Sequence, residues 1–171
     1  EFTPNKVGSY IFVARNKEHV ATFVVGDKIK ETSAQAIRQF HEQGIETWMI
    51  TGDNEVVAKS VCEELGIDRY LAGALPLEKS RKIEELQTQG KVVAMVGDGV
   101  NDAPALAKAD LSLAMGTGTD VAMNASDVTL VKGDLLKAIE FLKLCQETMK
   151  IIKQNLFLSF IYNSLLIPVA G

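Results

Sequence analysis

A short apolar run that ends in a glycine-rich acidic loop constrains this chain more than any other feature. Residues 92–96 read VVAMV, and Gly97-Asp98-Gly99 follows directly. A strand that is apolar on both faces is typical of the interior of a parallel sheet, because helices cover such a sheet on both sides. The two glycines allow the chain to turn sharply where the strand ends. The sequence therefore predicts an α/β fold with Asp98 at the carboxyl edge of a parallel sheet, where such folds bind ligands.

The residues after this strand have the chemistry of a magnesium site. Asp98 and Asp102 carry carboxylates, Asn101 carries an amide, and Pro104 suits the first turn of a following helix. Magnesium takes hard oxygen ligands, commonly one or two carboxylates together with waters and phosphate oxygens. The loop therefore suits a Mg²⁺ ion held against a phosphate. The alternative is that Asp102 only caps the helix and Asp98 only forms the turn.

A second loop, Thr51-Gly52-Asp53, has the same setting between a strand and a helix. It follows the apolar segment 47–50 and precedes a helical pattern at 55–65. A hydroxyl and the N–H groups of a turn at a helix N-terminus are suitable donors to a phosphoryl oxygen. By itself the tripeptide is weak evidence, because Asp53 or Asn54 would be an ordinary helix cap. The agreement of two such loops favours a shared ligand site.

A third segment carries an unusual positive charge. Pro76 is placed to open a helix, and Lys79 then lies in its first turns. A lysine at this position opposes the helix dipole. That opposition favours a functional role for Lys79 over that of an ordinary solvated side chain.

The rest of the chain reads as alternating strands and helices, a pattern that predicts a parallel sheet with helices on both faces. A helical stripe from Leu135 to Ile152 continues into an uncharged tail, so one long helix is expected there. The expected strands are 9–14, 20–25, 47–50, 70–72, 92–96, 111–115 and 128–131, and the expected helices are 33–43, 55–65, 77–89, 104–108 and 120–124.

Taken in order, the segments TGD, LPLEKSRKIEEL and MVGDGVNDAPALAKAD resemble the phosphorylation domain of the P-type ATPases, a branch of the haloacid-dehalogenase-like fold. Asp27 looks like the hinge aspartate that leads out of their nucleotide-binding domain, and residues 116–131 look like the last strands of the phosphorylation domain. Residues 152–163 are similar to a membrane helix of the heavy-metal-transporting subclass. Within that subclass, the Tyr162-Asn163 pair resembles the pattern of the copper exporters.

The resemblance implies a role for each loop residue. Asp98 would contact Mg²⁺ directly, and Asp102 would contact it directly or through a neighbouring group. Lys79 would offset the negative charge where the nucleophile and the phosphate meet. The remaining implied roles are phosphoryl binding by Thr51 and the Gly52 amide, a catalytic role for Asp53 in the same motif, and orientation of the magnesium loop by Asn101.

The resemblance also implies the reaction of a longer parent protein. Such a parent transfers the γ-phosphoryl group of ATP to an aspartate, hydrolyses the aspartyl-phosphate and exports a soft metal ion, here Cu(I). Tyr162 and Asn163 are then candidates for the copper path, although oxygen and amide groups are poor Cu(I) ligands and sulfur ligands elsewhere must supply most of the affinity.

One family motif is absent from the sequence. P-type ATPases accept the phosphoryl group on the first aspartate of an Asp-Lys-Thr-Gly-Thr segment, and this sequence contains none. Asp27 and Lys28 share its first two letters only, so Asp27 is expected to have a structural or hinge role. The fragment alone is therefore expected to be inactive. The expected parts are the end of a nucleotide-binding domain (1–26), a phosphorylation domain without its nucleophile strand (27–134), and a linking helix with the start of a truncated membrane helix (135–171).

Composition limits the partners. The net charge of −4, without a basic stripe, gives no sign of nucleic-acid binding. Cys62 and Cys145 match no zinc spacing, so reduced cysteines packed as small apolar residues are expected. The first residues show no export signal.

The uncharged tail suggests contact with a membrane. Residues 156–171 are apolar but shorter than the roughly 20 residues that a spanning helix needs. Lysines at 143, 150 and 153 place the preceding helix on the cytoplasmic side. The expected partners are thus membrane lipid and the remaining domains of the parent. The alternative is a C-terminal helix that packs on its own domain.

Two other functions stay open at this stage. A free-standing phosphatase of the same fold would use the same loops on a small phosphate ester, but it needs its own aspartate nucleophile at a strand end. A non-enzymatic, membrane-associated regulatory module would bind phosphate or magnesium through the intact loops. An upstream Asp-Lys-Thr-Gly-Thr segment would distinguish the transporter from both.

Overall fold

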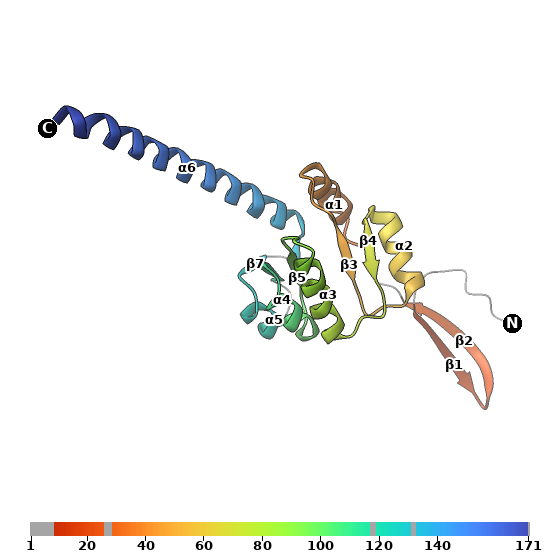
Figure 1. The fold of residues 1–171 in the computed structure, drawn as a ribbon. Coiled ribbons are helices and arrows are strands. Elements are labelled where there is room, and N and C mark those ends of the chain that lie inside the picture. Colours follow the sequence, from red (N-terminus) through yellow and green to blue (C-terminus); the bar gives the residue numbers. More distant parts are fainter. Residues whose placement is uncertain (1–8, 26–28, 117–118, 131–132, 171) are drawn as a thin grey trace.

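The computed structural model describes residues 9–25, 29–116, 119–130 and 133–170. The predicted helices and strands are all present, and their ends differ from prediction by at most two residues. Asp27, the predicted hinge aspartate, lies outside the described residues. In chain order the elements are β1 (Ser9–Arg15), β2 (Glu18–Val25), α1 (Ser33–Glu42), β3 (Trp48–Ile50), α2 (Glu55–Leu65), β4 (Arg69–Leu71), α3 (Pro76–Thr88), β5 (Ala94–Gly97), the 3₁₀ helix η1 (Val100–Asp102), α4 (Ala103–Leu106), β6 (Leu111–Met115), α5 (Asp120–Asn124), β7 (Val128–Leu130) and α6 (Leu136–Ala170) (Figure 1).

Local signals in the sequence set the starts of the helices that follow the strands. Asn54 is the cap of α2, because its side chain accepts a hydrogen bond from the Val57 amide at 3.0 Å. Pro76 is the first residue of α3, and the Glu78 carboxylate accepts from the Leu75 amide at 2.8 Å. Each of these helices therefore begins directly after the turn that leaves a strand.

The described strands form three separate sheets. β1 and β2 pair as an antiparallel hairpin, β3 pairs with β4 in parallel, and β5, β6 and β7 form a parallel sheet in that order. The prediction that residues 92–96 form a central strand is wrong for this structure. β5 starts only at Ala94 and lies at the edge of its sheet, and Val92 is 88% exposed. The physical reason is that no described strand pairs with the open edge of β5.

Helices cover both faces of the β5–β6–β7 sheet, as predicted. Met95 and Ala114 point to one face, where they pack with residues of α3, α4 and α5. Val96 and Leu113 point to the other face, toward Ala138 of α6 and residues of α1. The alternation of successive side chains along each strand produces the two clusters. The first cluster contains Ile83, Met95, Ala105, Leu106, Ala114 and Ala122.

α6 is one continuous helix of 35 residues, as the sequence predicts. Its first turns pack against α1, and Ala138 also packs with Leu113 and Leu130 of the sheet. Ala138 and Ile139 are both buried. The remainder extends away from the body of the molecule (Figure 1). Among the described residues, no helix combines the length and apolar character needed to cross a membrane.

Candidate functional site

The loop after β5 is organised around the carboxylate of Asp102. The Lys79 ammonium donates a hydrogen bond to Asp102 Oδ1 at 2.7 Å, and each of the two side chains is only 13% exposed. The other oxygen, Oδ2, accepts weakly from the backbone amides of Asp98 and Gly99 at 3.3 and 3.4 Å. Both oxygens of Asp102 are therefore engaged by the protein. This carboxylate holds the loop around Asp98 and fixes the position of Lys79.

Gly97 is required by the close approach of Asp102. A Cβ atom built on Gly97 would lie 2.7 Å from the Asp102 Cβ and 3.1 Å from one carboxylate oxygen. Any larger residue would displace the Asp102 side chain. The glycine at the end of β5 thus makes room for the carboxylate that orders the loop.

Asp98 is the exposed carboxylate of this loop. Its backbone carbonyl accepts from the Thr119 amide at 2.9 Å, which ties the loop to the start of α5. In the part of the chain that the structure describes, the Asp98 carboxylate has no hydrogen bond or ion pair of its own. Asn101 is also exposed, and its side chain likewise has no hydrogen bond to the described residues. Asp98 is therefore available to an external ligand, and the orienting role of Asn101 stays a prediction.

The Thr51 turn after β3 is closed by its own side chains. The Thr51 hydroxyl donates to Asp53 Oδ2 at 2.8 Å and accepts from the Asp53 amide at 3.1 Å. The Thr51 carbonyl accepts from the Ala74 amide at 2.9 Å, so the loop after β4 supports the turn. The Gly52 amide makes no hydrogen bond within the described residues. Gly52 therefore offers a free donor, whereas the Thr51 hydroxyl must leave Asp53 to donate elsewhere.

Helix α3 links the two loops, because it follows β4 and packs on α4. Ser80 of α3 donates to the Pro104 carbonyl of α4 at 3.2 Å. Two further contacts join α3 to Lys108, just after α4: Gln87 donates to the Lys108 carbonyl at 2.9 Å, and Lys108 pairs with Glu84 at 2.6 Å. These contacts fix the position of Lys79 relative to Asp102. Among the described residues, no hydrogen bond joins the Thr51 turn directly to the Asp98 loop.

The family model of haloacid dehalogenase-like hydrolases matches residues 4–110, more than half of the chain. The chain belongs to this family.

Several proteins similar to this chain are named as metal-transporting ATPases. A copper-exporting P-type ATPase of Staphylococcus saprophyticus is 49% identical over 161 residues, and a probable copper-transporting ATPase, PacS, of Synechocystis is 47% identical over 161 residues. Each alignment covers 94% of this chain. A crystal structure of a zinc-transporting PIB-type ATPase in the E2.Pi state matches with a TM-score of 0.85 and 32% identity over 94% of this chain.

These matches confirm the predicted resemblance to the heavy-metal P-type ATPases. The chain spans about a fifth of the length of the two relatives, 20% and 22%, and 26% of the zinc-transporting structure. It therefore corresponds to one part of a much larger protein in each comparison.

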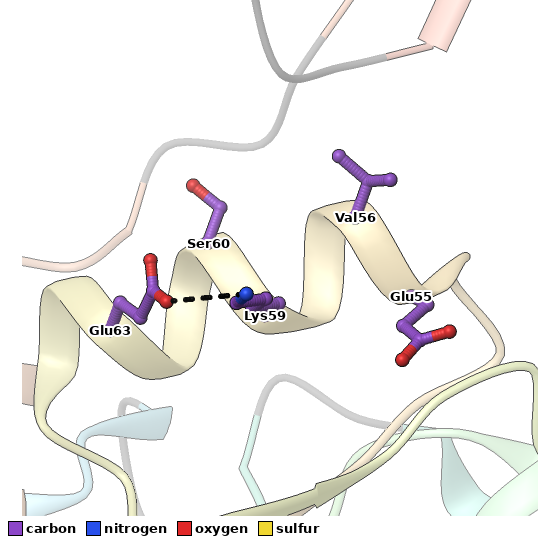
Figure 2. Close-up of a pocket in the computed structure, with 5 residues that line it drawn as sticks. All are labelled: Glu55, Val56, Lys59, Ser60 and Glu63. Atoms are coloured by element: carbon purple, nitrogen blue, oxygen red, sulfur yellow. Dashed lines mark ion pairs between the residues drawn. The ribbon is translucent and has the colours of Figure 1, made fainter.

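A hollow on the surface of the described residues lies along α2. The hollow on α2, of about 420 Å³, is lined by Glu55, Val56, Lys59, Ser60 and Glu63 (Figure 2). Lys59 and Glu63 form an ion pair of 3.9 Å, and both side chains are largely exposed. None of the predicted site residues lines this hollow, so it is a surface depression without the chemistry of the loops.

Tyr162 and Asn163 lie on the extended part of α6, far along the helix from the buried Ala138 and Ile139. Both side chains are exposed. No group of three or more His, Cys, Asp or Glu side chains suited to a metal ion occurs among the described residues. The copper-path role of Tyr162 and Asn163 therefore stays a prediction.

Proposed function

We propose that the chain supplies the Mg²⁺- and phosphate-binding loops of an ATP-driven copper-export pump that forms and hydrolyses an aspartyl-phosphate. The observation that carries the proposal is the 2.7 Å contact between Lys79 and Asp102, because it joins two of the three motifs in one enclosed site. The names of the copper-transporting relatives support copper as the transported ion and ATP as the energy source.

The residues of the Asp98 loop fit a magnesium ion. Asp98 offers an exposed carboxylate, while Asp102 is occupied by Lys79 and by two backbone amides. We therefore assign the direct contact to Asp98 and give Asp102 the role of holding the loop. Magnesium often takes only one or two carboxylates and completes its shell with waters and phosphate oxygens, so a site with one free carboxylate suits it. When bound, Mg²⁺ would neutralise charge on the transferred phosphoryl group.

The phosphoryl group would be held by this chain's own donors. The Gly52 amide has a free N–H, and the Thr51 hydroxyl becomes a donor when it releases Asp53. Lys79 supplies a positive charge from the side of α3. An opposite unit charge about 4 Å away contributes roughly 4 kcal/mol at an effective dielectric constant of 20. A difference of this size changes a rate about a thousandfold, which is why a positioned lysine matters.

The phosphate acceptor would come from a strand between β3 and β5. Both strands have an unpaired edge among the described residues, and their carboxyl ends carry the Thr51 turn and Asp98. A parallel strand inserted there would extend one sheet across both halves and would bury Ala94, which is exposed. An aspartate at the carboxyl end of that strand would lie between the two loops. The chain alone, which lacks the Asp-Lys-Thr-Gly-Thr segment, is then inactive.

The domain division follows from the same proposal. Residues 1–26 end the nucleotide-binding domain, residues 27–134 belong to the phosphorylation domain, and residues 135–171 lead to the membrane. The partners are the nucleotide-binding, actuator and membrane domains of the parent, and lipid around the distal part of α6. The site would face the cytoplasm.

Phosphoenzyme formation in the full-length parent tests the assignment. Asp98→Ala should abolish acid-stable label from γ-labelled ATP in the presence of Mg²⁺, and Lys79→Ala should reduce it severely. Glu64→Ala, an exposed change on α2, should label normally. The isolated chain should take up no stable label. Near-normal turnover in the Asp98 or Lys79 variant would refute their roles, and stimulation of the parent by Zn²⁺ but not by Cu(I) would refute copper as the cargo.

A further inference from the structure

The strands β4, β6 and β7 each pair in parallel with a strand that comes earlier in the chain. An aspartate directly precedes each of these three strands. Asp68 precedes β4, Asp110 precedes β6 and Asp127 precedes β7. In each parallel pair, the aspartate faces the residue that comes directly before the first paired residue of the neighbouring strand. The three facing pairs are here called the strand clamps: Thr47–Asp68, Val93–Asp110 and Ser112–Asp127.

Two clamps have the same four-atom arrangement. Asp127 Oδ2 accepts from the Ser112 amide at 2.9 Å and from its hydroxyl at 2.7 Å, while the Asp127 amide donates back to the Ser112 hydroxyl oxygen at 2.9 Å. Asp68 Oδ2 accepts from the Thr47 amide at 2.7 Å and its hydroxyl at 2.8 Å, and the Asp68 amide donates back at 3.2 Å. His41 Nε2 lies 2.9 Å from the same Asp68 oxygen.

The third clamp uses only backbone donors on the facing strand. Asp110 Oδ2 accepts from the Val93 amide at 2.8 Å, and the Asp110 amide donates to the Val93 carbonyl at 2.9 Å. Ser112 and Thr47 are buried polar residues, at 4% and 8% exposure. The clamp supplies the hydrogen-bond partners of the Ser112 hydroxyl, whereas the Thr47 hydroxyl also lies 3.0 Å from His41 Nε2. Each clamp thus fixes one residue of a strand to one residue of its neighbour.

The clamped strands carry the candidate site at their other ends. β3 leads to Thr51, β5 leads to Asp98, and β6 leads toward Thr119, whose amide donates to the Asp98 carbonyl. Asp98 follows Val93 by five residues, about 16 Å along an extended strand. The clamps therefore lie at the amino edge of the sheets, remote from the loops that they serve.

We propose that Asp68, Asp110 and Asp127 are positioning residues that lock the strand register and so align the phosphate and magnesium loops at the opposite edge. The parallel strands are only three to five residues long, so few ladder bonds oppose a slip. A slip of one residue moves a loop by about 3.3 Å and turns every side chain to the other face. The magnesium part of this inference rests on the proposed function, whereas the alignment of the loops does not.

The test compares Asp110→Ala with Asp110→Asn in the full chain. Asparagine keeps a side-chain oxygen that can accept from the Val93 amide, whereas alanine removes it. Both variants lose one negative charge. A difference between their readouts therefore reports the loss of the hydrogen-bond acceptor and not the loss of charge. Glu64→Ala removes a charge from an exposed site that has no hydrogen bond or ion pair among the described residues, and serves as the matched control.

Two readouts are taken under conditions in which all variants are folded. The first is the backbone-amide NMR signals of Asp98 and Thr119, which lie at the carboxyl edge. The second is the apparent Mg²⁺ affinity, measured from the Mg²⁺-induced shift of the Asp98 signal.

Asp110→Ala should shift both signals and weaken Mg²⁺ binding by about tenfold, the lower end of losses seen when outer partners of a metal ligand are removed. Asp110→Asn should restore both readouts nearly to those of the unaltered chain. A clamp with only a local role would confine the shifts to residues near 93 and 110, and that result would overturn the inference. If the unaltered chain shows no Mg²⁺-induced shift, the proposed function fails, and the Asp98 and Thr119 signals still decide the clamp.

Discussion

The ammonium group of Lys79 and the carboxylate of Asp102 lie 2.7 Å apart, although the two residues are 23 positions apart in the chain. Lys79 reaches the pair from α3 and Asp102 from η1. The second carboxylate oxygen of Asp102 faces the amides of the Asp98 loop. The Asp102 side chain thus holds both the candidate magnesium loop and the candidate phosphate-neutralising lysine. Substitution of either residue of the pair should therefore disturb the whole site.

A double-mutant cycle should show strong coupling within this pair. Lys79→Met and Asp102→Ala should each lower the free energy of unfolding by about 1.5–3 kcal/mol, because each leaves a largely enclosed charged group without its partner. The double variant should lose less than the sum of the two single losses. Urea denaturation supplies the four values. Additive losses would show that the pair contributes nothing beyond its separate residues.

The exposed pair Lys108–Glu84 is the matched control for this cycle. Its distance is 2.6 Å, but its side chains are 52% and 54% exposed. Solvent screening should make its coupling much weaker than that of the Lys79–Asp102 pair. The contrast between the two cycles measures the effect of enclosure on an ion pair within the same domain.

A methyl group at residue 97 should be poorly tolerated. Gly97→Ala places Cβ 2.7 Å from the Asp102 Cβ, so the carboxylate must move away from Lys79. We expect a loss of about 1–3 kcal/mol in the free energy of unfolding, as for other overpacked sites. Gly52→Ala is the control for stability, since the nearest atom to its Cβ is the Ala74 carbonyl oxygen at 3.8 Å. Equal stability of the two variants would contradict the packing argument.

The helices and strands were predictable because their signals are local. Asn54 and Pro76 mark helix starts, and the apolar periodicity extends through α6. The division of the parallel strands into two sheets was not predictable from the same signals. The VVAMV run has the composition of a central strand, but β5 lies at the edge of its sheet, because no described strand pairs with its open edge.

The sequence motifs predicted Lys79, Asp98 and Asp102 as neighbours of a phosphate, and the structure brings Lys79 and Asp102 into direct contact. The direct pairing of Lys79 with Asp102 depends on the packing of α3 on α4, which no single motif encodes. The strand clamps went unrecognised, because an aspartate before a strand looks like an ordinary loop residue. The sequence signal for the strand clamps is the recurrence of an aspartate directly before β4, β6 and β7.

Removal of the distal part of α6 should leave the domain stable. Leu156, Phe157 and Phe160 are each more than half exposed, so they contribute little packing to the domain. Deletion of residues 156–171 should change the free energy of unfolding by at most about 0.5 kcal/mol while it reduces self-association. Ile139→Ala, at the buried base of the same helix, should cost about 2–5 kcal/mol. A large loss on deletion, measured on the monomer, would show that the tail packs on its own domain.

Acid should weaken the Ser112–Asp127 clamp. The Ser112 hydroxyl, followed by the Ser112 amide, holds the pKa of Asp127 below its usual value because both donors favour the ionised carboxylate. A folded-state pKa below the unfolded-state pKa means that the ionised group stabilises the fold above the unfolded value, about 3.9. That stabilisation is lost as the pH falls through the lowered folded-state pKa. The chain should therefore lose part of its stability below about pH 4 through this residue.

Asp127→Asn isolates this contribution. Asparagine retains an acceptor oxygen but cannot ionise, so the stability advantage of the unaltered chain over the variant should be constant above about pH 5 and should shrink toward pH 3. Urea denaturation of both chains across this range measures the difference. Glu64→Gln, whose side chain makes no hydrogen bond or ion pair to the described residues, controls for the loss of one carboxylate. A difference between the Asp127→Asn variant and the unaltered chain that stays constant into acid would show that the ionised form of Asp127 does not strengthen the clamp.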